Sequence, residues 1–298
     1  MTGDLDNRKD RVMLRGSDLR LFESGETVNC PDLDHDQLLL LIHGFTAHGR
    51  YFDEMAATLT KYGYRVIYYN YNSYCGIELA ARILYEQLEI LDKKGNGVLA
   101  DKGIRIIAHS MGGLVARSFI AMDDVERYVK GVITLGTPHM GTMTSKRLLW
   151  FFRKWAEHVS GDMLLPGFMT SQSAKELTGN DSDKLETSFL YRLRELTKST
   201  KIPLISVSGG RKQLELVKFR PLNKLLNIQL QLLLSCDTND GLVPEHSADI
   251  RCCVKGDNAP VAHFNAYAEY AVLNHSGLAA NYQLGMRITD WFEASKQT

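Results

Sequence analysis

Hydrophobic and polar positions divide the chain into short, wholly apolar runs and longer amphipathic ones. The short runs are apolar on both faces, as in strands buried within a parallel sheet, and they cover 38–42, 64–71, 104–108, 129–135 and 202–208. Between the earlier runs, apolar residues recur at helical spacing over 51–61, over 77–91 and after 110. This alternation predicts βαβ units and a doubly wound, mostly parallel α/β sheet.

The alternation stops between 142 and 200, where no run has the pattern of a strand. Apolar residues share one helical face over Lys146–Val159 and again over Leu185–Leu196, and 161–183 has the composition of a loop. We therefore expect a single domain over 1–298, with the helical segment 142–200 inserted into it.

The two ends of the chain have weaker patterns. Near the N-terminus, 12–14 and Leu19–Phe22 predict short antiparallel edge strands. Residues 222–234 are apolar with some alternation and fit either a helix or a strand. A last strand is expected near Tyr267–Leu273, followed by a last helix over Ala280–Glu293.

Composition narrows the class of protein. Of the 298 residues, 44% are hydrophobic and 23% are charged, and the formal net charge is zero. These values fit a globular enzyme and lack the basic footprint of a nucleic-acid binder. The N-terminus lacks the pattern of a signal peptide and no apolar run is long enough to cross a bilayer, so we expect a cytoplasmic protein.

The cysteines and histidines are scattered along the chain. The five cysteines are odd in number and form no C-x-x-C pair, which favours free thiols in a reduced compartment over a disulfide framework. Neither residue type has the spacing of metal ligands, so we expect no metal and no cofactor.

The segment from Ile104 to Ala116 is organised around Ser110. Its sequence, I-R-I-I-A-H-S-M-G-G-L-V-A, predicts a strand, a tight turn with the serine at its tip, and a helix that begins at once. This arrangement holds a hydroxyl clear of the sheet edge, beside the N–H groups of a helix N-terminus. The usual pattern is G-x-S-x-G, and Ala108 is small enough to replace its first glycine. Ser110 is therefore a candidate nucleophile.

A serine nucleophile needs a base, and the base needs a third group that orients it. An α/β-hydrolase arrangement places such residues on loops at the C-terminal edge of the sheet, in the chain order Ser, Asp or Glu, His. This chain supplies Ser110, then Asp240 within D-T-N-D-G-L-V-P, and then His275 within N-H-S-G. These three residues are the candidate catalytic set.

Five segments resemble an α/β-hydrolase of the bacterial lipase/esterase type. They are H-G-F at 43–45, A-H-S-M-G-G at 108–113, G-T-P-H-M-G at 136–141, N-D-G-L-V-P at 239–244 and N-H at 274–275. The second is similar to the motif of small bacterial lipases, and the third and fourth to segments of larger ones. The resemblance covers the chain from about residue 38 onward and implies the α/β-hydrolase fold.

The resemblance also implies roles for residues around Ser110. The backbone N–H groups of Phe45 and Met111 would form the oxyanion hole, and Gly44 would let the backbone come close. Gly44 and His109 are candidate substrate-binding residues. His109 has a second interpretation, as a structural residue that points away from the substrate.

Neighbouring acids and histidines offer alternatives to the candidate set. Asp237 competes with Asp240, and the match to D-G-L-V favours Asp240. His246 and His263 compete with His275, but His263 precedes the last expected strand instead of following it. The remaining histidines of the motifs, which we expect to pack or to stabilise loops, are His43 and His139.

Related enzymes carry a lid or cap where this chain has 142–200. The basic amphipathic helix expected over Lys146–Val159 would then cover the site, with Trp150, Phe152 and Trp155 as candidate substrate-binding residues. A helix that only packs on the domain is the alternative. The larger bacterial lipases place a calcium-ligating aspartate just after the catalytic histidine. Residues 276–278 contain no carboxylate, so we expect no such calcium site.

The function expected from these residues is that of a serine hydrolase, an esterase or lipase that cleaves carboxylic esters through an acyl-enzyme. The partners expected are a small-molecule acyl ester or lipid and, transiently, a membrane or lipid interface, but no nucleic acid; the oligomeric state stays open. A thioesterase or lipid deacylase of the same fold is the alternative. A non-catalytic binding protein is a third hypothesis, and the presence of all three triad residue types weighs against it.

Overall fold

The computed structural model describes residues 17–45, 47–141, 171–178, 188–198, 200–214, 220–234, 238–254, 261–266 and 273–294. Its strands are β1 Asp18–Leu21, β2 Leu38–Ile42, β3 Arg65–Asn70, β4 Ile104–His109, β5 Val129–Leu135, β6 Leu204–Ser208 and β7 Val261–Asn265. They form one sheet in the order β1-β3-β2-β4-β5-β6-β7. Only the pair of β1 and β3 is antiparallel. The predicted doubly wound, mostly parallel sheet is confirmed.

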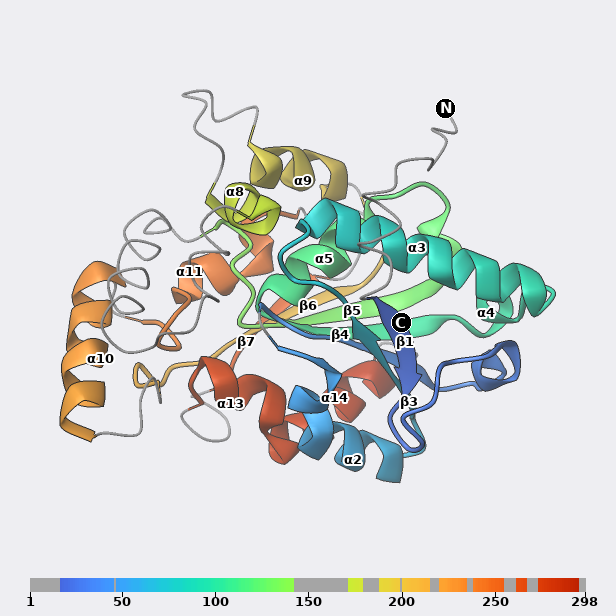
Figure 1. Ribbon diagram of the computed structural model, residues 1–298, viewed down its shortest axis with the longest axis horizontal. Coiled ribbons are helices and arrows are strands. Elements are labelled where there is room, and N and C mark those ends of the chain that lie inside the picture. The colour runs from blue at the N-terminus through green and yellow to red at the C-terminus, as the bar shows by residue number, and fades with distance from the viewer. Residues whose placement is uncertain are drawn as a thin grey trace.

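Helices cover both faces of this sheet (Figure 1). The α-helices are α2 Asp53–Lys61, α3 Ile77–Lys94, α4 Val98–Lys102, α5 Met111–Ile120, α8 Gln172–Thr178, α9 Phe189–Thr197, α10 Arg220–Leu234, α11 Glu245–Ala248, α13 His275–Ala280 and α14 Tyr282–Ala294. The described residues also form 3-10 helices, which are η1 Cys30–Leu33, η2 Gly49–Phe52, η3 Val125–Arg127 and η5 Ile250–Cys252. No helix in the described ranges is long and apolar enough to cross a membrane.

The central strands are apolar on both faces because each face has its own core. In β2, Leu38, Leu40 and Ile42 pack with α3 and α5, whereas Leu39 and Leu41 pack with α2 and α14 on the opposite face. All five side chains are fully buried. Successive residues of a strand point to opposite faces, so a strand between two helical layers must be apolar throughout.

Two elements of the C-terminal part differ from or sharpen the expectation. The ambiguous stretch 222–234 lies within helix α10. The last strand in the described residues is Val261–Asn265, earlier than the one expected near Tyr267–Leu273. The expected strand lies almost wholly outside the described residues. His263 therefore belongs to β7, which the sequence pattern hid because β7 is short, half-buried and contains polar residues.

The insertion 142–200 is described only in part, and Lys146–Val159 lies outside the described residues. The loop expected over 161–183 is wrong at α8, which is a helix. Contacts from far along the chain support α8: Ser173 Oγ accepts a hydrogen bond from the N–H of Gly76 at 3.0 Å, and the Glu176 carboxylate accepts one from the N–H of Ile77. Such tertiary support does not show in a polar seven-residue stretch.

Two adjacent glycines let helix α5 approach the ends of β2 and β5. A Cβ added at Gly112 would lie 2.4 Å from the His43 carbonyl oxygen, and one at Gly113 would lie 2.0 Å from Thr137 Oγ1. Both distances are shorter than any van der Waals contact. The second and third residues of α5 must therefore be glycine for the turn at Ser110 to sit against the sheet.

Replacing Gly112 with alanine is therefore expected to destabilise the protein, by roughly 1–3 kcal/mol in the free energy of unfolding, because the new methyl group meets backbone that cannot rotate away. Urea unfolding followed by circular dichroism measures it. Gly131→Ala in β5 is the matched control, since its added Cβ would lie 3.7 Å from the nearest atom. Equal stability of the two variants would contradict the packing argument.

Candidate active site

Ser110 lies in a strained turn between β4 and α5. Its backbone angles are φ 54° and ψ −126°, a conformation that residues other than glycine rarely adopt. The N–H of Ser110 donates to the Leu135 carbonyl at 2.8 Å, and its own carbonyl accepts from the N–H of Gly113 at 3.0 Å. These bonds fix the turn at the C-terminal ends of β4 and β5, so the hydroxyl projects from the sheet edge.

The structure brings the three candidate catalytic residues into hydrogen-bonding succession. His275 Nε2 lies 2.8 Å from Ser110 Oγ, and His275 Nδ1 lies 2.7 Å from Asp240 Oδ2. The N–H of His275 also donates to the Asp240 carbonyl at 2.8 Å. Asn274 forms the N-cap of α13 by accepting a hydrogen bond from the N–H of Gly277. The N-terminus of α13 therefore holds the His275 imidazole between a hydroxyl and a carboxylate.

The loop that carries Asp240 fixes its carboxylate from the other side. Asp240 Oδ1 accepts hydrogen bonds from the N–H groups of Leu242 at 3.0 Å and Val243 at 2.7 Å, which leaves Oδ2 for the histidine. Asn239 shapes the same loop by accepting from the N–H of Gly241 at 2.9 Å. Asp240 is only 1% exposed, so its orientation depends on these backbone donors.

Two glycines that the sequence analysis did not assign to the site allow the carboxylate and imidazole to meet. A Cβ at Gly136 would lie 2.8 Å from Asp240 Oδ2 and 3.0 Å from His275 Nδ1. A Cβ at Gly209 would lie 3.0 Å from the Cβ of Asp240. The signal for both is that each follows directly after a strand, β5 and β6, at the sheet edge where the candidates gather.

Of the candidate oxyanion residues, Met111 follows Ser110 directly, and Phe45 follows Gly44, which lies against Ser110. Met111 is the first residue of α5, so its N–H has no partner within the helix. Gly44 passes so close that a Cβ there would lie 2.9 Å from the Cβ of Ser110. His43 Nδ1 donates to the Gly44 carbonyl at 2.8 Å, and the N–H of Tyr71 donates to His43 Nε2 at 3.2 Å. His43 is thus a loop-stabilising residue in the structure.

His109 lies behind the site and is fully buried. Its Nε2 lies 2.8 Å from the His275 carbonyl oxygen, so Nε2 carries the hydrogen and donates it. Its ring lies beside those of His275 and Tyr51. Burial, and then the neighbouring His275, lower the pKa of His109 to about 3, and burial lowers that of His43 to about 4. These contacts favour the structural interpretation of His109.

Replacing His109 with glutamine, which keeps a donor, is expected to change how stability depends on pH. The folded-state pKa of His109 is below the unfolded value of 6.5, so the unfolded chain binds the extra proton in acid. Above pH 6.5 the His109 imidazole is neutral in both states, and its titration does not change the stability of the fold. As the pH falls from 6.5 toward 3, the free energy of unfolding decreases by about 1.4 kcal/mol per pH unit, because the unfolded chain gains the proton first. The variant should lack this slope in urea unfolding measured from neutral to acid pH.

A control for that measurement is Leu59→Ala in α2, which removes buried packing but no titrating group. It should lower stability at every pH and leave the slope at its wild-type value. If His109→Gln gives a curve parallel to that of the wild type, His109 is not held neutral in the folded protein.

The competing histidines lie elsewhere or are engaged by other groups. His263 Nδ1 and Nε2 lie 2.8 Å from Ser206 Oγ and 3.3 Å from Ser208 Oγ, respectively. His246 is exposed on α11. His139 is buried, with Nε2 3.0 Å from Thr134 Oγ1. Asp237 and the candidate substrate-binding residues Trp150, Phe152 and Trp155 lie outside the described residues.

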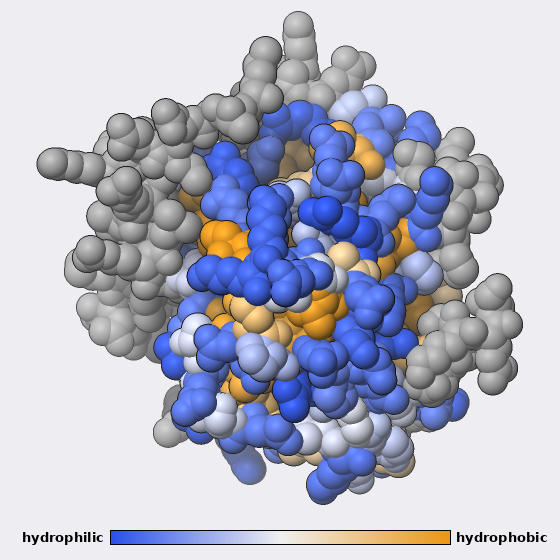
Figure 2. Space-filling view, turned by 90° about the vertical axis from the view of Figure 1, so that its right-hand side faces the viewer, coloured by the Kyte–Doolittle hydropathy of each residue, from blue (hydrophilic) through white to orange (hydrophobic). Residues whose placement is uncertain are grey.

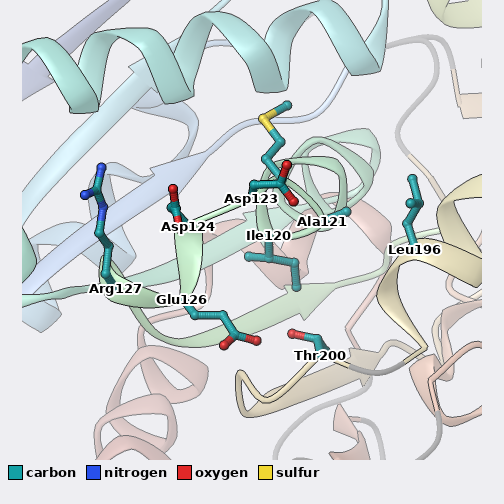
Figure 3. A pocket seen from close by; sticks show the side chains of 9 residues that line it. Ile120, Ala121, Asp123, Asp124, Glu126, Arg127, Leu196 and Thr200 are labelled. Atoms are coloured by element: carbon teal, nitrogen blue, oxygen red, sulfur yellow. The ribbon is translucent and has the colours of Figure 1, made fainter. Parts of the chain in front are cut away.

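A pocket of about 390 Å³ lies away from Ser110, at the far end of α5 (Figure 3). Its lining includes Asp123, Asp124, Glu126, Arg127 and Leu196. The far end of α5 faces the N-terminal edge of the sheet, whereas Ser110, Asp240 and His275 lie at the C-terminal edge. In the described residues, no three histidines, cysteines or carboxylates gather as metal ligands, there or at Ser110. Figure 3 shows the side chains of Asp123, Asp124, Glu126 and Arg127 among those that line this pocket.

Comparisons with known proteins bear on the family and the fold of this chain. A family model described as "Putative serine esterase (DUF676)" matches residues 33–252. No curated protein matches the chain. Among solved structures, the chain is similar to the mature lipase BlEst2 of Bacillus licheniformis, at 17% sequence identity and a TM-score of 0.58, over 86% of this chain and 91% of that one.

Two further solved structures share the same fold. EstA from Clostridium botulinum has 15% identity and a TM-score of 0.51, with 87% of each chain covered. The metagenomic carboxyl esterase MGS0156 has 15% identity and a TM-score of 0.54, over 87% of this chain and 76% of that one. The family match spans most of the chain and includes Ser110 and Asp240. This chain therefore belongs to the family described as "Putative serine esterase (DUF676)" and has the α/β-hydrolase fold.

Proposed function

We propose that this protein hydrolyses carboxylic esters through an acyl-enzyme formed on Ser110. The observation that carries the proposal is the unbroken succession from Ser110 Oγ to His275 Nε2 at 2.8 Å and from His275 Nδ1 to Asp240 Oδ2 at 2.7 Å. A serine, a histidine and a buried carboxylate in this order constitute the machinery of acyl transfer. Membership of a serine esterase family supports the same reaction class.

The hydrogen-bonding roles follow from the chemistry of the carboxylate. An ionised Asp240 can only accept, so His275 Nδ1 carries the hydrogen and Nε2 has a free lone pair. Nε2 therefore takes the proton of Ser110 as Oγ attacks the acyl carbon. The imidazolium then gives that proton to the departing alcohol oxygen. In the second half, Nε2 takes a proton from water, the resulting hydroxide attacks the acyl-enzyme, and the acid leaves as Ser110 regains its proton.

The negative charge that develops on the acyl oxygen would be stabilised by the N–H groups of Met111 and Phe45. The first N–H groups of α5 point out of the helix, toward the space next to Ser110. In a trans peptide the C=O and N–H point in opposite directions. Because His43 holds the Gly44 carbonyl, it also sets the direction of the Phe45 N–H. Each such donor lowers the barrier by about 3 kcal/mol.

His109 has a supporting role in this proposal. The backbone of His275 is held at both of its polar groups, since its N–H donates to Asp240 and its carbonyl accepts from His109. A neutral His109 beside His275 also avoids repulsion with the imidazolium that forms during the reaction. We therefore propose His109 as a positioning residue for His275, in place of a residue that binds substrate.

The segment 142–200 is proposed as a cap on the α3 and α5 side of the sheet. Its described parts are attached to that layer: α8 bonds to the N-terminus of α3, and Thr197 of α9 accepts from the Arg117 side chain of α5 at 2.9 Å. Both helices lie over this layer in Figure 1. This position is compatible with control over what reaches Ser110.

A fluorophosphonate probe tests the proposal directly, because it reacts with an activated serine and leaves a covalent adduct. Intact-mass spectrometry should show one adduct on the wild-type protein and none on Ser110→Ala. Ser118→Ala, a buried serine on the same helix, is the matched control and should label as the wild type does. If the wild type labels no faster than Ser110→Ala, the protein is not a serine hydrolase.

A further inference from the structure

Helix α10 exposes an apolar stripe along its outer side. Leu225, Ile228 and Leu232 are 51%, 50% and 72% exposed, and their spacing of three and four residues places them on one face over two turns. Leu226 and Leu230 of the same helix are buried against the protein. The helix is therefore apolar on two sides, although only one of them faces the molecule.

This stripe is distinct among the described helices. No other helix of the described ranges exposes three large apolar side chains. Figure 2 views the molecule from the end opposite α10, and hydrophilic residues dominate that surface, with apolar ones between them. Apolar side chains that face water raise the free energy of the protein. Such a face is therefore expected to be covered during function.

The surroundings of the stripe are basic. Arg211, Lys212, Arg220 and Lys224 are all exposed, two on α10 and two on the segment before it. Over 211–234 the sequence holds five basic residues and one acidic residue, Glu215, whereas the whole chain has no net charge. Helices that lie in the plane of an anionic lipid surface typically combine an apolar face with basic residues around it.

Helix α10 is also tied to the loop of the candidate active site. Gln231 Oε1 accepts a hydrogen bond from Asn239 Nδ2 at 3.0 Å, and Gln231 Nε2 donates one to the backbone carbonyl of Lys212 at 3.0 Å. Asn239 precedes Asp240 and shapes its turn. Figure 1 shows α10 at the outer margin of the molecule, beyond the end of the sheet where α13 begins. A surface that binds α10 would therefore lie close to the loops around Ser110.

We propose that α10 is an interfacial helix that docks this protein on an anionic lipid surface. Leu225, Ile228 and Leu232 enter the acyl boundary, and the basic rim contacts the headgroups. The inference concerns the surface of the molecule and goes beyond the ester hydrolysis proposed above. It also separates the docking helix from the segment 142–200, which is proposed as a cap.

Vesicle flotation of the full chain tests this inference. The wild type should float with vesicles that contain phosphatidylglycerol and remain below with phosphatidylcholine alone, and salt should weaken its binding. The triple variant Leu225→Gln, Ile228→Gln, Leu232→Gln should bind at least about tenfold more weakly, because it loses the apolar anchor. Glutamine is a good helix former, so α10 should persist.

Two controls separate docking from general surface chemistry and from catalysis. The matched triple variant removes exposed apolar residues from other helices and should float as the wild type does: Ile90→Gln, Leu196→Gln and Met286→Gln. Ser110→Ala should also bind vesicles like the wild type, whereas the α10 variant should retain hydrolysis of a soluble short-chain ester. A failure of docking is thus distinct from a failure of the proposed hydrolase function.

Three results would overturn the inference. The first is a wild type that floats with neither kind of vesicle. The second is an α10 variant that floats as well as the wild type. The third is a wild type that sediments as a dimer in solution while the α10 variant sediments as a monomer, since the stripe would then be covered by a second copy of this chain.

Discussion

Replacing Ser110 with alanine is expected to lower kcat for hydrolysis of p-nitrophenyl butyrate by on the order of a millionfold, to the residual rate that binding and the oxyanion donors alone support. The variant should fold normally, because alanine occupies the same turn and Ser110 makes its structural bonds through its backbone. Initial rates and a urea unfolding curve on the same preparation measure both quantities.

Ser118→Ala controls for the loss of a hydroxyl from helix α5 and should keep wild-type kcat. A residual activity of Ser110→Ala within about tenfold of the wild type, a difference of about 1.4 kcal/mol in barrier height, would show that another group is the nucleophile. A series of p-nitrophenyl esters from acetate to palmitate, tested with the wild type, would report the preferred acyl chain length. A sharp preference for acetate would favour an esterase over a lipase.

Replacing Asp240 with asparagine is expected to lower kcat by about ten-thousandfold with little effect on binding. The asparagine amide can present a hydrogen to His275 Nδ1, which moves the imidazole hydrogen to Nε2 and removes the lone pair that accepts the Ser110 proton. The two backbone donors that hold Oδ1 should still orient the side chain. Steady-state kinetics near neutral pH measure the loss.

Asp237→Asn is the matched control, because Asp237 was the competing acid in the same segment of the sequence. It should keep at least about half of the wild-type kcat, since no step of the proposed mechanism depends on it. The opposite outcome, with Asp237→Asn inactive and Asp240→Asn active, would transfer the orienting role to Asp237.

The sequence was sufficient to predict the layers of the sheet and the candidates at its edge. The run 38–42 is apolar at every position, and only a strand between two helical layers requires this. The order of Ser110, Asp240 and His275 predicted residues that the structure brings together from three distant loops. Strong local patterns and the fixed edge of a parallel sheet were enough for these predictions.

Other features depend on contacts that a local pattern does not contain. Helix α8 is short and polar, and its support comes from the N-terminus of α3, about a hundred residues earlier in the chain. The pattern of 222–234 was ambiguous because α10 is apolar on two sides, which blurs its helical period. The partner of His109 is a carbonyl far along the chain, so its place behind His275 could not be predicted from its position beside Ser110.

The backbone of Ser110 places the reactive residue in conflict with its own turn. At φ 54° and ψ −126° a glycine would be relaxed, whereas any side chain adds strain of roughly 1–3 kcal/mol. The close packing of Gly112 and Gly113 and the hydrogen bond from the Ser110 N–H to Leu135 hold the turn in this conformation despite the strain. Only a change to glycine would relax the turn, and that change removes the hydroxyl together with the rest of the side chain. The strain thus persists only under selection for activity, and a relative that has lost its reaction would be free to relax there.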